Sequence, residues 1–81
     1  MKTRTTRHFD RAFLKFPAQV RRLYNKQVSF LVIDIRHPSL RAKKYDETEG
    51  VWQMRVTNNI RAYFLIQGDV YIFLDIEKHR D

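Results

Sequence analysis

Residues 51–77 read VWQMRV-TNN-IRAYFLI-QGD-VYIFLDIE, three runs rich in β-branched and aromatic residues that are separated by two short polar breaks. Runs of this length and composition, bounded by Asn, Gly and Asp, are typical of β-strands joined by tight turns. The stretch therefore predicts an antiparallel meander of three strands, Val51–Val56, Ile60–Ile66 and Val70–Glu77.

Side chains of a strand alternate between the two faces of a sheet, so each predicted strand has two sets of residues. One set is wholly apolar and needs a cover: Trp52, Met54, Val56, Ile60, Ala62, Phe64, Ile66, Val70, Ile72, Leu74 and Ile76. The other set mixes cations, rings and carboxylates: Gln53, Arg55, Arg61, Tyr63, Leu65, Tyr71, Phe73, Asp75 and Glu77. Arginines beside aromatic rings suit a phosphate backbone with bases that can stack. Cross-strand pairing on an ordinary half-exposed sheet uses the same residues, so both interpretations stay open.

The first half of the chain predicts two helices that cover the apolar face. Thr6 is a suitable N-cap for a first helix with apolar residues at Phe9, Ala12, Phe13 and Phe16. A second helix follows Pro17 and keeps a 3.6-residue period from Val20 to Ile35, with Gln27 as the one polar member. His37-Pro38-Ser39 ends it, because the residue before a proline avoids the helical region.

Two short segments extend the sheet. Lys2–Thr5 suits a brief edge strand, and Leu40–Tyr45 suits a further polar strand before an acidic turn at residues 46–50. The fold expected for residues 1–81 is therefore one α+β domain of order β-α-α-β-β-β-β. Its two N-terminal helices pack on one face of a mainly antiparallel sheet of three to five strands.

Composition favours a polyanionic partner. The chain has 81 residues, 16 Lys and Arg against nine Asp and Glu, and a net charge of +7. Such a field attracts nucleic acids and speeds encounter with them. Cysteine is absent, which excludes disulfides and thiolate metal sites and favours the cytoplasm. No signal peptide and no membrane-spanning run are predicted.

The candidate site residues suit metal-free cleavage of a phosphodiester. Glycine-rich phosphate loops and zinc-ligand spacings are absent from the sequence, so no cofactor or metal is expected. RNA can use its own 2′-hydroxyl as nucleophile, and the protein then supplies a base, an acid and cations. Arg55 and Arg61 would supply charge and His79 would exchange a proton. Glu49, or its neighbours Glu47 and Asp46, would act as base if the acidic turn approaches the arginines.

Other residues are candidates for RNA contact or for structural roles. Lys43 and Lys44 suit phosphate contact, and Tyr63 and Tyr71 suit stacking on bases. His8 and His37 are expected to be surface or capping residues.

Several of these residues resemble the RelE/ParE toxin superfamily of small bacterial proteins. The resemblance rests on three stretches: His37-Pro38-Ser39-Leu40-Arg41-x-Lys43-Lys44, Glu49-Gly50-Val51-Trp52-Gln53-Met54-Arg55-Val56, and Ile60-Arg61-Ala62-Tyr63-Phe64 through Gly68-Asp69 to Lys78-His79-Arg80-Asp81. Many relatives continue past the histidine to an aromatic residue, which this sequence lacks.

The resemblance implies the toxin of a bacterial type II toxin–antitoxin system, a ribosome-associated endoribonuclease that cleaves messenger RNA and stops translation. Arg55 and Arg61 match the sheet arginines of the family, His79 its terminal histidine, and Lys43 and Lys44 its basic segment. The implied partners are a cognate antitoxin, mRNA and the ribosome, with a homodimer or a toxin–antitoxin hetero-oligomer both open. Two alternatives remain: a non-enzymatic ParE-like inhibitor of DNA gyrase, and an RNA-binding module without catalysis.

Overall fold

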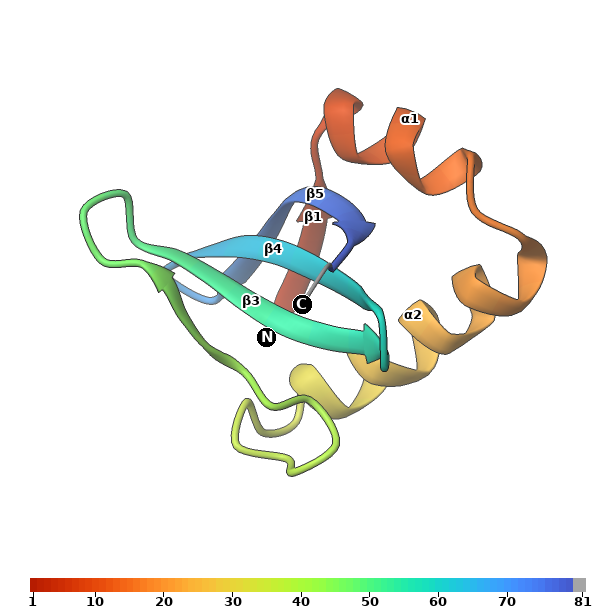
Figure 1. Ribbon diagram of the computed structural model, residues 1–81. Helices are drawn as coiled ribbons and strands as arrows, with labels where there is room; N and C mark the ends of the chain where they lie inside the picture. The colour runs from red at the N-terminus through yellow and green to blue at the C-terminus, as the bar shows by residue number, and fades with distance from the viewer. Residues whose placement is uncertain (80–81) are drawn as a thin grey trace.

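The computed structural model describes residues 1–79, which form a five-stranded sheet with two helices on one side (Figure 1). The elements in chain order are β1 (Lys2–Thr5), α1 (Arg7–Leu14), α2 (Ala18–Leu31), β2 (Lys43–Asp46), β3 (Val51–Thr57), β4 (Ile60–Gln67) and β5 (Val70–Lys78). The strand order is β1-β5-β4-β3-β2, with β1 parallel to β5 and the other neighbours antiparallel. The predicted α+β class and element order are confirmed.

The helices begin where the sequence indicates, but α2 ends earlier than expected. The Thr6 hydroxyl accepts a hydrogen bond of 3.1 Å from the N–H of Phe9, and Pro17 precedes α2. The helical period was expected to continue to Ile35, whereas α2 ends at Leu31. A turn replaces it because the Asp34 carboxylate accepts from the backbone N–H of Arg36 at 2.9 Å, which competes with helical hydrogen bonding. Among the described residues, no helix has the length and apolar character needed to cross a bilayer.

An aromatic cluster joins the helices to β5. Phe9 of α1 is 1% exposed, and its ring lies 5.6 Å from that of Phe73 and 5.2 Å from that of Tyr24. Tyr24 of α2 meets Phe73 edge-on at 5.2 Å. Rings at these separations and tilts attract each other beyond the effect of area buried. The three rings therefore connect both helices to the sheet.

A β-bulge in β5 overturns part of the predicted division between the two faces. Tyr63 of β4 pairs with Asp75, but the next residue, Phe64, pairs with Phe73, so Leu74 is the extra residue of β5. Side chains before the bulge consequently lie on the face opposite to the one that uninterrupted alternation predicts. Tyr71 and Phe73, expected on the bare face, are 5% and 0% exposed in the core.

Replacement of Phe9 by Ala should lower the free energy of unfolding by about 3 kcal/mol, because removal of a ring packed against the rings of Phe13, Tyr24 and Phe73 leaves a cavity. Leu14→Ala in the same helix is the matched control, since Leu14 is 73% exposed and should change stability by less than about 0.5 kcal/mol. Urea denaturation of both variants measures the difference. Equal losses would show that the cluster does not hold α1 to the sheet.

Candidate functional site

Arg55 and Arg61 lie directly opposite each other on neighbouring strands, on the face of the sheet without helices. Cross-strand partners share a face, and the register aligns Arg55 with Arg61 and Arg61 with Glu77. The adjacent partners Met54, Ala62 and Ile76 are at most 2% exposed beneath the helices, so the arginine row projects to the other side. We call the surface formed by Gln53, Arg55, Arg61, Tyr63, Asp75 and Glu77 the helix-free face.

The Arg55 guanidinium is held at an energetic cost. Its Nε is buried and has no hydrogen-bond partner among residues 1–79. A buried donor without a partner loses about 1–3 kcal/mol of solvation. Two arginines directly opposite each other on adjacent strands also repel. A side chain kept in such a position is more typical of a binding or catalytic group than of one that stabilises the fold.

Arg61 instead contacts the turn between β3 and β4. Its Nη1 donates to the carbonyls of Thr57 at 2.7 Å, Asn58 at 3.1 Å and Ile60 at 3.2 Å. The backbone N–H of His79 donates to the carbonyl of Asn59 in the same turn at 2.7 Å. Arg55, Arg61 and His79, which the sequence separates by up to 24 positions, are thus gathered at one end of the sheet.

The acidic turn does not approach the arginines. Asp46 accepts from the backbone N–H groups of Thr48 at 2.9 Å and Glu49 at 3.2 Å, so the turn is closed on itself. It precedes Val51, and a strand rises about 3.3 Å per residue, which separates Val51 from Arg55 by about 13 Å. The condition set for Glu49 as base is therefore not met. Glu77, which pairs with Arg61, is a carboxylate beside the arginines.

Tyrosine rings occupy the centre of the helix-free face. Tyr63 is 7% exposed because Tyr45 of β2 covers it edge-on, with ring centres 4.9 Å apart, while Tyr45 itself is 61% exposed. Burial and the negative charge of Glu77 raise the pKa of the Tyr63 hydroxyl, which therefore stays a neutral hydrogen-bond donor. A depression of about 220 Å³ beside the two rings is also lined by Asp46, Leu74, Asp75 and Glu77.

The two predicted lysines separate onto different faces. Lys43 pairs with Gln53, on the helix-free side, whereas Lys44 pairs with Trp52. The Lys44 ammonium lies 5.6 Å from the centre of the Trp52 ring and 3.9 Å from the carboxylate of Glu47. Lys43 therefore shares a face with the arginines and Lys44 does not.

Tyr71 cannot stack on a ligand at this face. It belongs to the aromatic core, where its ring meets Phe64 edge-on at 5.4 Å. Burial, with a smaller contribution from the charge of Asp34, raises the pKa of its hydroxyl. The prediction for Tyr71 was wrong because the bulge at Leu74 reverses the direction of its side chain.

His8 is a residue that sequence reasoning missed. It was expected to be a surface or capping residue, and it is exposed, but its Nε2 lies 3.2 Å from the Asp75 carboxylate on the helix-free face. The contact joins α1 to β5 across 67 positions. A sequence signal for it is lacking, because neither residue belongs to a local motif.

Comparison with solved structures identifies the architecture. The YoeB/ParE toxin from Agrobacterium tumefaciens superposes with a TM-score of 0.81 at 14% identity, over 99% of this chain and 100% of that one. The RelE–RelB complex of Pyrococcus horikoshii gives 0.78 at 12% identity, over 95% and 92%. The RelB–RelE antitoxin–toxin complex of Methanococcus jannaschii gives 0.75 at 16% identity, over 93% and 88%.

The chain has the fold of the RelE/ParE toxins. No protein-family model and no curated protein matches the sequence. The fold implied by the sequence resemblance is confirmed; Arg80 and Asp81, the last residues of that resemblance, lie outside the described residues.

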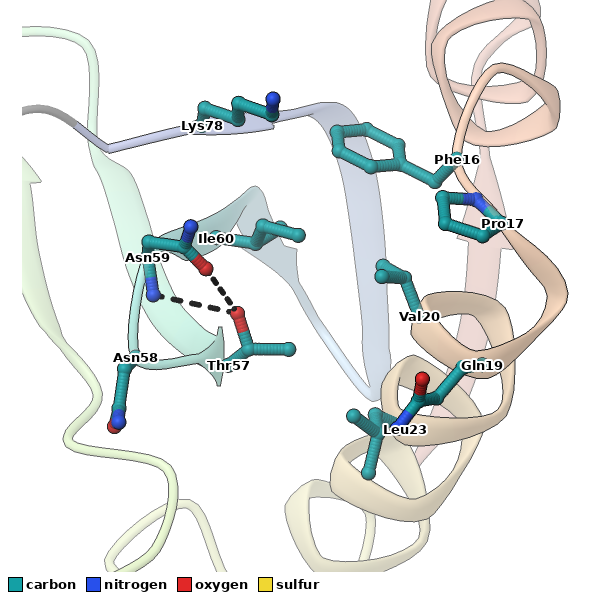
Figure 2. Close-up of a pocket in the computed structure, with 10 residues that line it drawn as sticks. All are labelled: Phe16, Pro17, Gln19, Val20, Leu23, Thr57, Asn58, Asn59, Ile60 and Lys78. Atoms are coloured by element: carbon teal, nitrogen blue, oxygen red, sulfur yellow. Dashed lines mark hydrogen bonds between the residues drawn. The ribbon is translucent and has the colours of Figure 1, made fainter.

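This RelE/ParE fold carries a groove on the side away from the tyrosines. Figure 2 shows Phe16 and Val20 from the helical side and Ile60 from the sheet pointing into the gap between them. The groove has a volume of about 520 Å³, and Lys78 is among the residues that line it. A neighbouring pocket of about 410 Å³ continues it past Phe16 to Lys15 and Ile76. The two share Phe16, Pro17 and Lys78 in their linings, and together they form a mainly apolar channel, which we call the helix–sheet groove.

Replacement of Arg55 by Met should raise the free energy of unfolding by about 1 kcal/mol, because it removes an unpartnered buried donor and a like-charge contact. Arg61→Met, which also removes the like-charge contact but breaks the bonds to the turn, should instead lower stability by about 1 kcal/mol. Urea denaturation measures both. A loss of stability in Arg55→Met would make Arg55 a structural residue.

Proposed function

We propose that the chain is the toxin of a type II toxin–antitoxin pair, and that it cleaves messenger RNA on cytoplasmic ribosomes with its helix-free face. The fold shared with RelE and ParE toxins supports the toxin class. The observation that carries the nuclease proposal is the pair formed by Arg55 and Arg61 on that face, with the buried Arg55 Nε unpartnered. A phosphate placed there would offset the repulsion between the two arginines.

The proposed reaction transfers the phosphoryl group of the RNA backbone from the 5′-oxygen to the 2′-oxygen. The 2′-oxygen attacks the adjacent phosphorus while a base removes its proton, and the P–O5′ bond breaks as an acid protonates the leaving 5′-oxygen. The products are a 2′,3′-cyclic phosphate and a 5′-hydroxyl. Arg55 and Arg61 stabilise the charge that builds on the phosphate, and His79 is the proposed acid. Glu77 takes the role of base that the sequence assigned to Glu49.

Substrate contacts follow the same face. Lys43 lies on the side of the arginines and is proposed to meet a phosphate. Tyr45, with most of its ring exposed and Tyr63 behind it, replaces Tyr71 as the ring on which a base stacks. Tyr63 positions that ring and keeps its own hydroxyl as a donor. Because stacking tolerates every base, these contacts favour affinity over sequence selection.

A non-enzymatic ParE-like inhibitor of DNA gyrase is the second candidate. It is favoured by the hydrogen bonds of Arg61, which direct its Nη1 to three turn carbonyls. Under this alternative the helix-free face binds a protein, and the side chains of Arg55 and Arg61 have no chemical role. Gyrase supercoiling and RNA cleavage are separate assays, so the two candidates give different results.

The full chain added to an in vitro translation reaction should cut the message, with new 5′-ends mapped by primer extension. Arg55→Met should slow cleavage about 10²–10³-fold, as expected when one group that stabilises the charged transition state is lost. Gyrase supercoiling should be unaffected by the wild-type chain. Inhibition of gyrase without cleavage would replace the nuclease proposal with the alternative.

Two glutamates provide a matched control within this experiment. Glu77→Gln should slow cleavage by about 10²-fold, as should His79→Ala, because each removes a proposed proton-transfer group. Glu49→Gln, the same change in the distant acidic turn, should leave the rate within about twofold. If only Glu49→Gln is slow, the acidic turn reaches the site in the complex with RNA.

The proposed antitoxin contact is the helix–sheet groove. Its lining is mainly apolar and includes Lys15 and Lys78, so it fits a segment with apolar residues on one side and carboxylates on the other. In the solved complexes of RelE with RelB a protein of this fold is bound to its partner, which supports an antitoxin partner for this chain. A segment in the groove would contact the turn that Arg61 and His79 touch, which connects antitoxin binding to the site.

Val20→Asp should weaken binding of the proposed cognate antitoxin at least tenfold, because the new carboxylate would be buried against apolar side chains. Asn25→Asp introduces the same charge at an exposed position of α2 and should leave binding unchanged. Isothermal titration calorimetry measures both. Equal binding by wild type and Val20→Asp would exclude the groove.

A further inference from the structure

Gln27 is a buried polar residue in the apolar stripe of α2. It is 7% exposed, between partly buried residues that pack on the core. An amide in such a place is unfavourable unless its hydrogen bonds are made. Its partners therefore explain why a polar side chain occupies a position that helical periodicity assigns to the core.

The Gln27 amide joins three separate segments. Its Nε2 donates to the carbonyl of Ser39 at 2.9 Å and to the carbonyl of Arg55 at 2.7 Å, and its Oε1 accepts from the Ser39 hydroxyl at 3.1 Å. Both N–H groups and the oxygen of the amide are thus engaged. The side chain fixes the distance between α2, the loop that follows it and β3.

The hydrogen bond between Gln27 and Arg55 lies where β3 extends beyond its pairing with β2. β2 begins at Lys43, which pairs with Gln53, so Arg55 lies two residues past the start of the β2 ladder. There the N–H of Arg55 donates to the carbonyl of Leu40 at 2.7 Å, and its carbonyl accepts from Gln27. Both groups point to the same side of the strand, away from β4. Leu40 and Gln27 therefore take the place of a paired strand at Arg55.

The next residue of β3 is bulged. The register with β4 passes from Arg55 opposite Arg61 to Thr57 opposite Ile60, which leaves Val56 as the extra residue. A bulge bends its strand and redirects the neighbouring side chains. The direction of the Arg55 side chain thus depends on how the backbone beside the bulge is held.

We propose that Gln27 is a positioning residue for Arg55, and that its amide sets where the guanidinium meets a phosphate on the helix-free face. The inference rests on the proposed function in naming phosphate as the ligand. A purely structural Gln27 is the competing explanation. If Gln27 is a positioning residue, its loss slows catalysis only by displacing Arg55. If Gln27 is purely structural, its loss slows catalysis independently of Arg55.

Gln27→Met keeps the length of the side chain and removes both donors. It should lower kcat for RNA cleavage at least tenfold, with KM changed less than twofold, because RNA still docks on the remaining contacts. Val28→Ala, in the next position of α2 and also packed on the core, is the control for lost stability and should keep kcat within twofold. An equal fall of kcat in Val28→Ala would overturn the proposal.

The double variant Gln27→Met with Arg55→Met tests the coupling. If Gln27 acts through Arg55, adding Gln27→Met to Arg55→Met should not slow cleavage further. A second tenfold loss in the double variant would show that Gln27 acts by another route and would overturn the proposal.

A measurement without RNA separates this inference from the nuclease proposal. The Arg55 Nε–H is buried, so its signal in a ¹⁵N NMR spectrum of the full chain should exchange slowly with water. Gln27→Met should shift that signal and speed its exchange at least tenfold, and Val28→Ala should do neither. An unchanged signal in Gln27→Met would overturn the positioning role even if RNA is cleaved. A changed signal in a chain that cleaves no RNA would reject the nuclease proposal and leave the positioning role of Gln27 standing.

Discussion

The fold depends on β5 serving two environments along one strand. Its first half must present Tyr71 and Phe73 to the helices, and its second half must present Ile76 to them while Asp75 and Glu77 face the other way. Strict alternation cannot meet both needs, and the extra residue at Leu74 resolves the conflict. The aromatic cluster that binds α1 and α2 and the carboxylates beside the arginines therefore exist together because of one bulge.

The second bulge, at Val56 of β3, lies next to Arg55 and so affects the candidate site. Two features around it are unfavourable for stability: the arginines that face each other and the buried guanidinium nitrogen that has no partner among the described residues. It also supplies supports, since Gln27 and Leu40 hold the outer edge of β3 and Arg61 holds the turn. Unfavourable placement of a charge together with well-made backbone support is typical of a preorganised site. The site is thus set by the rigid sheet and by α2, and no mobile loop is required.

Local sequence signals predicted the elements well. The signals used were strand composition, the polar breaks, the Thr6 cap and Pro17. Each depends on only a few neighbouring residues, and the structure agrees with the elements that they predict. The end of α2 was missed because Asp34 forms a side-chain turn that hydrophobic periodicity does not reveal. Arg55 and Arg61 were placed correctly on one face because β3 and the first half of β4 keep their alternation up to that point.

The errors come from information that is not local. Nothing in the residues around Leu74 marks a bulge, since glycine is absent there and the run stays apolar. The bulge follows from packing against Phe9 and Tyr24, which lie about 65 and 50 positions away. The same holds for Lys44, turned to Trp52 by the pairing of β2, and for the contact of His8 with Asp75. Gln27 was noticed as an exception, but its partners could not be named before the loop and β3 were placed.

The parallel pairing of β1 with β5 has a consequence for synthesis. Residues 2–5 find their partner strand only after residues 70–73 have been made, so the sheet cannot close while the second half of the chain is still being translated. A growing chain on the ribosome therefore lacks β5, with Glu77, and the completed core. Under the proposed function, a nascent chain is harmless to the ribosome that makes it, and a partner that binds emerging segments meets this protein before its activity can form.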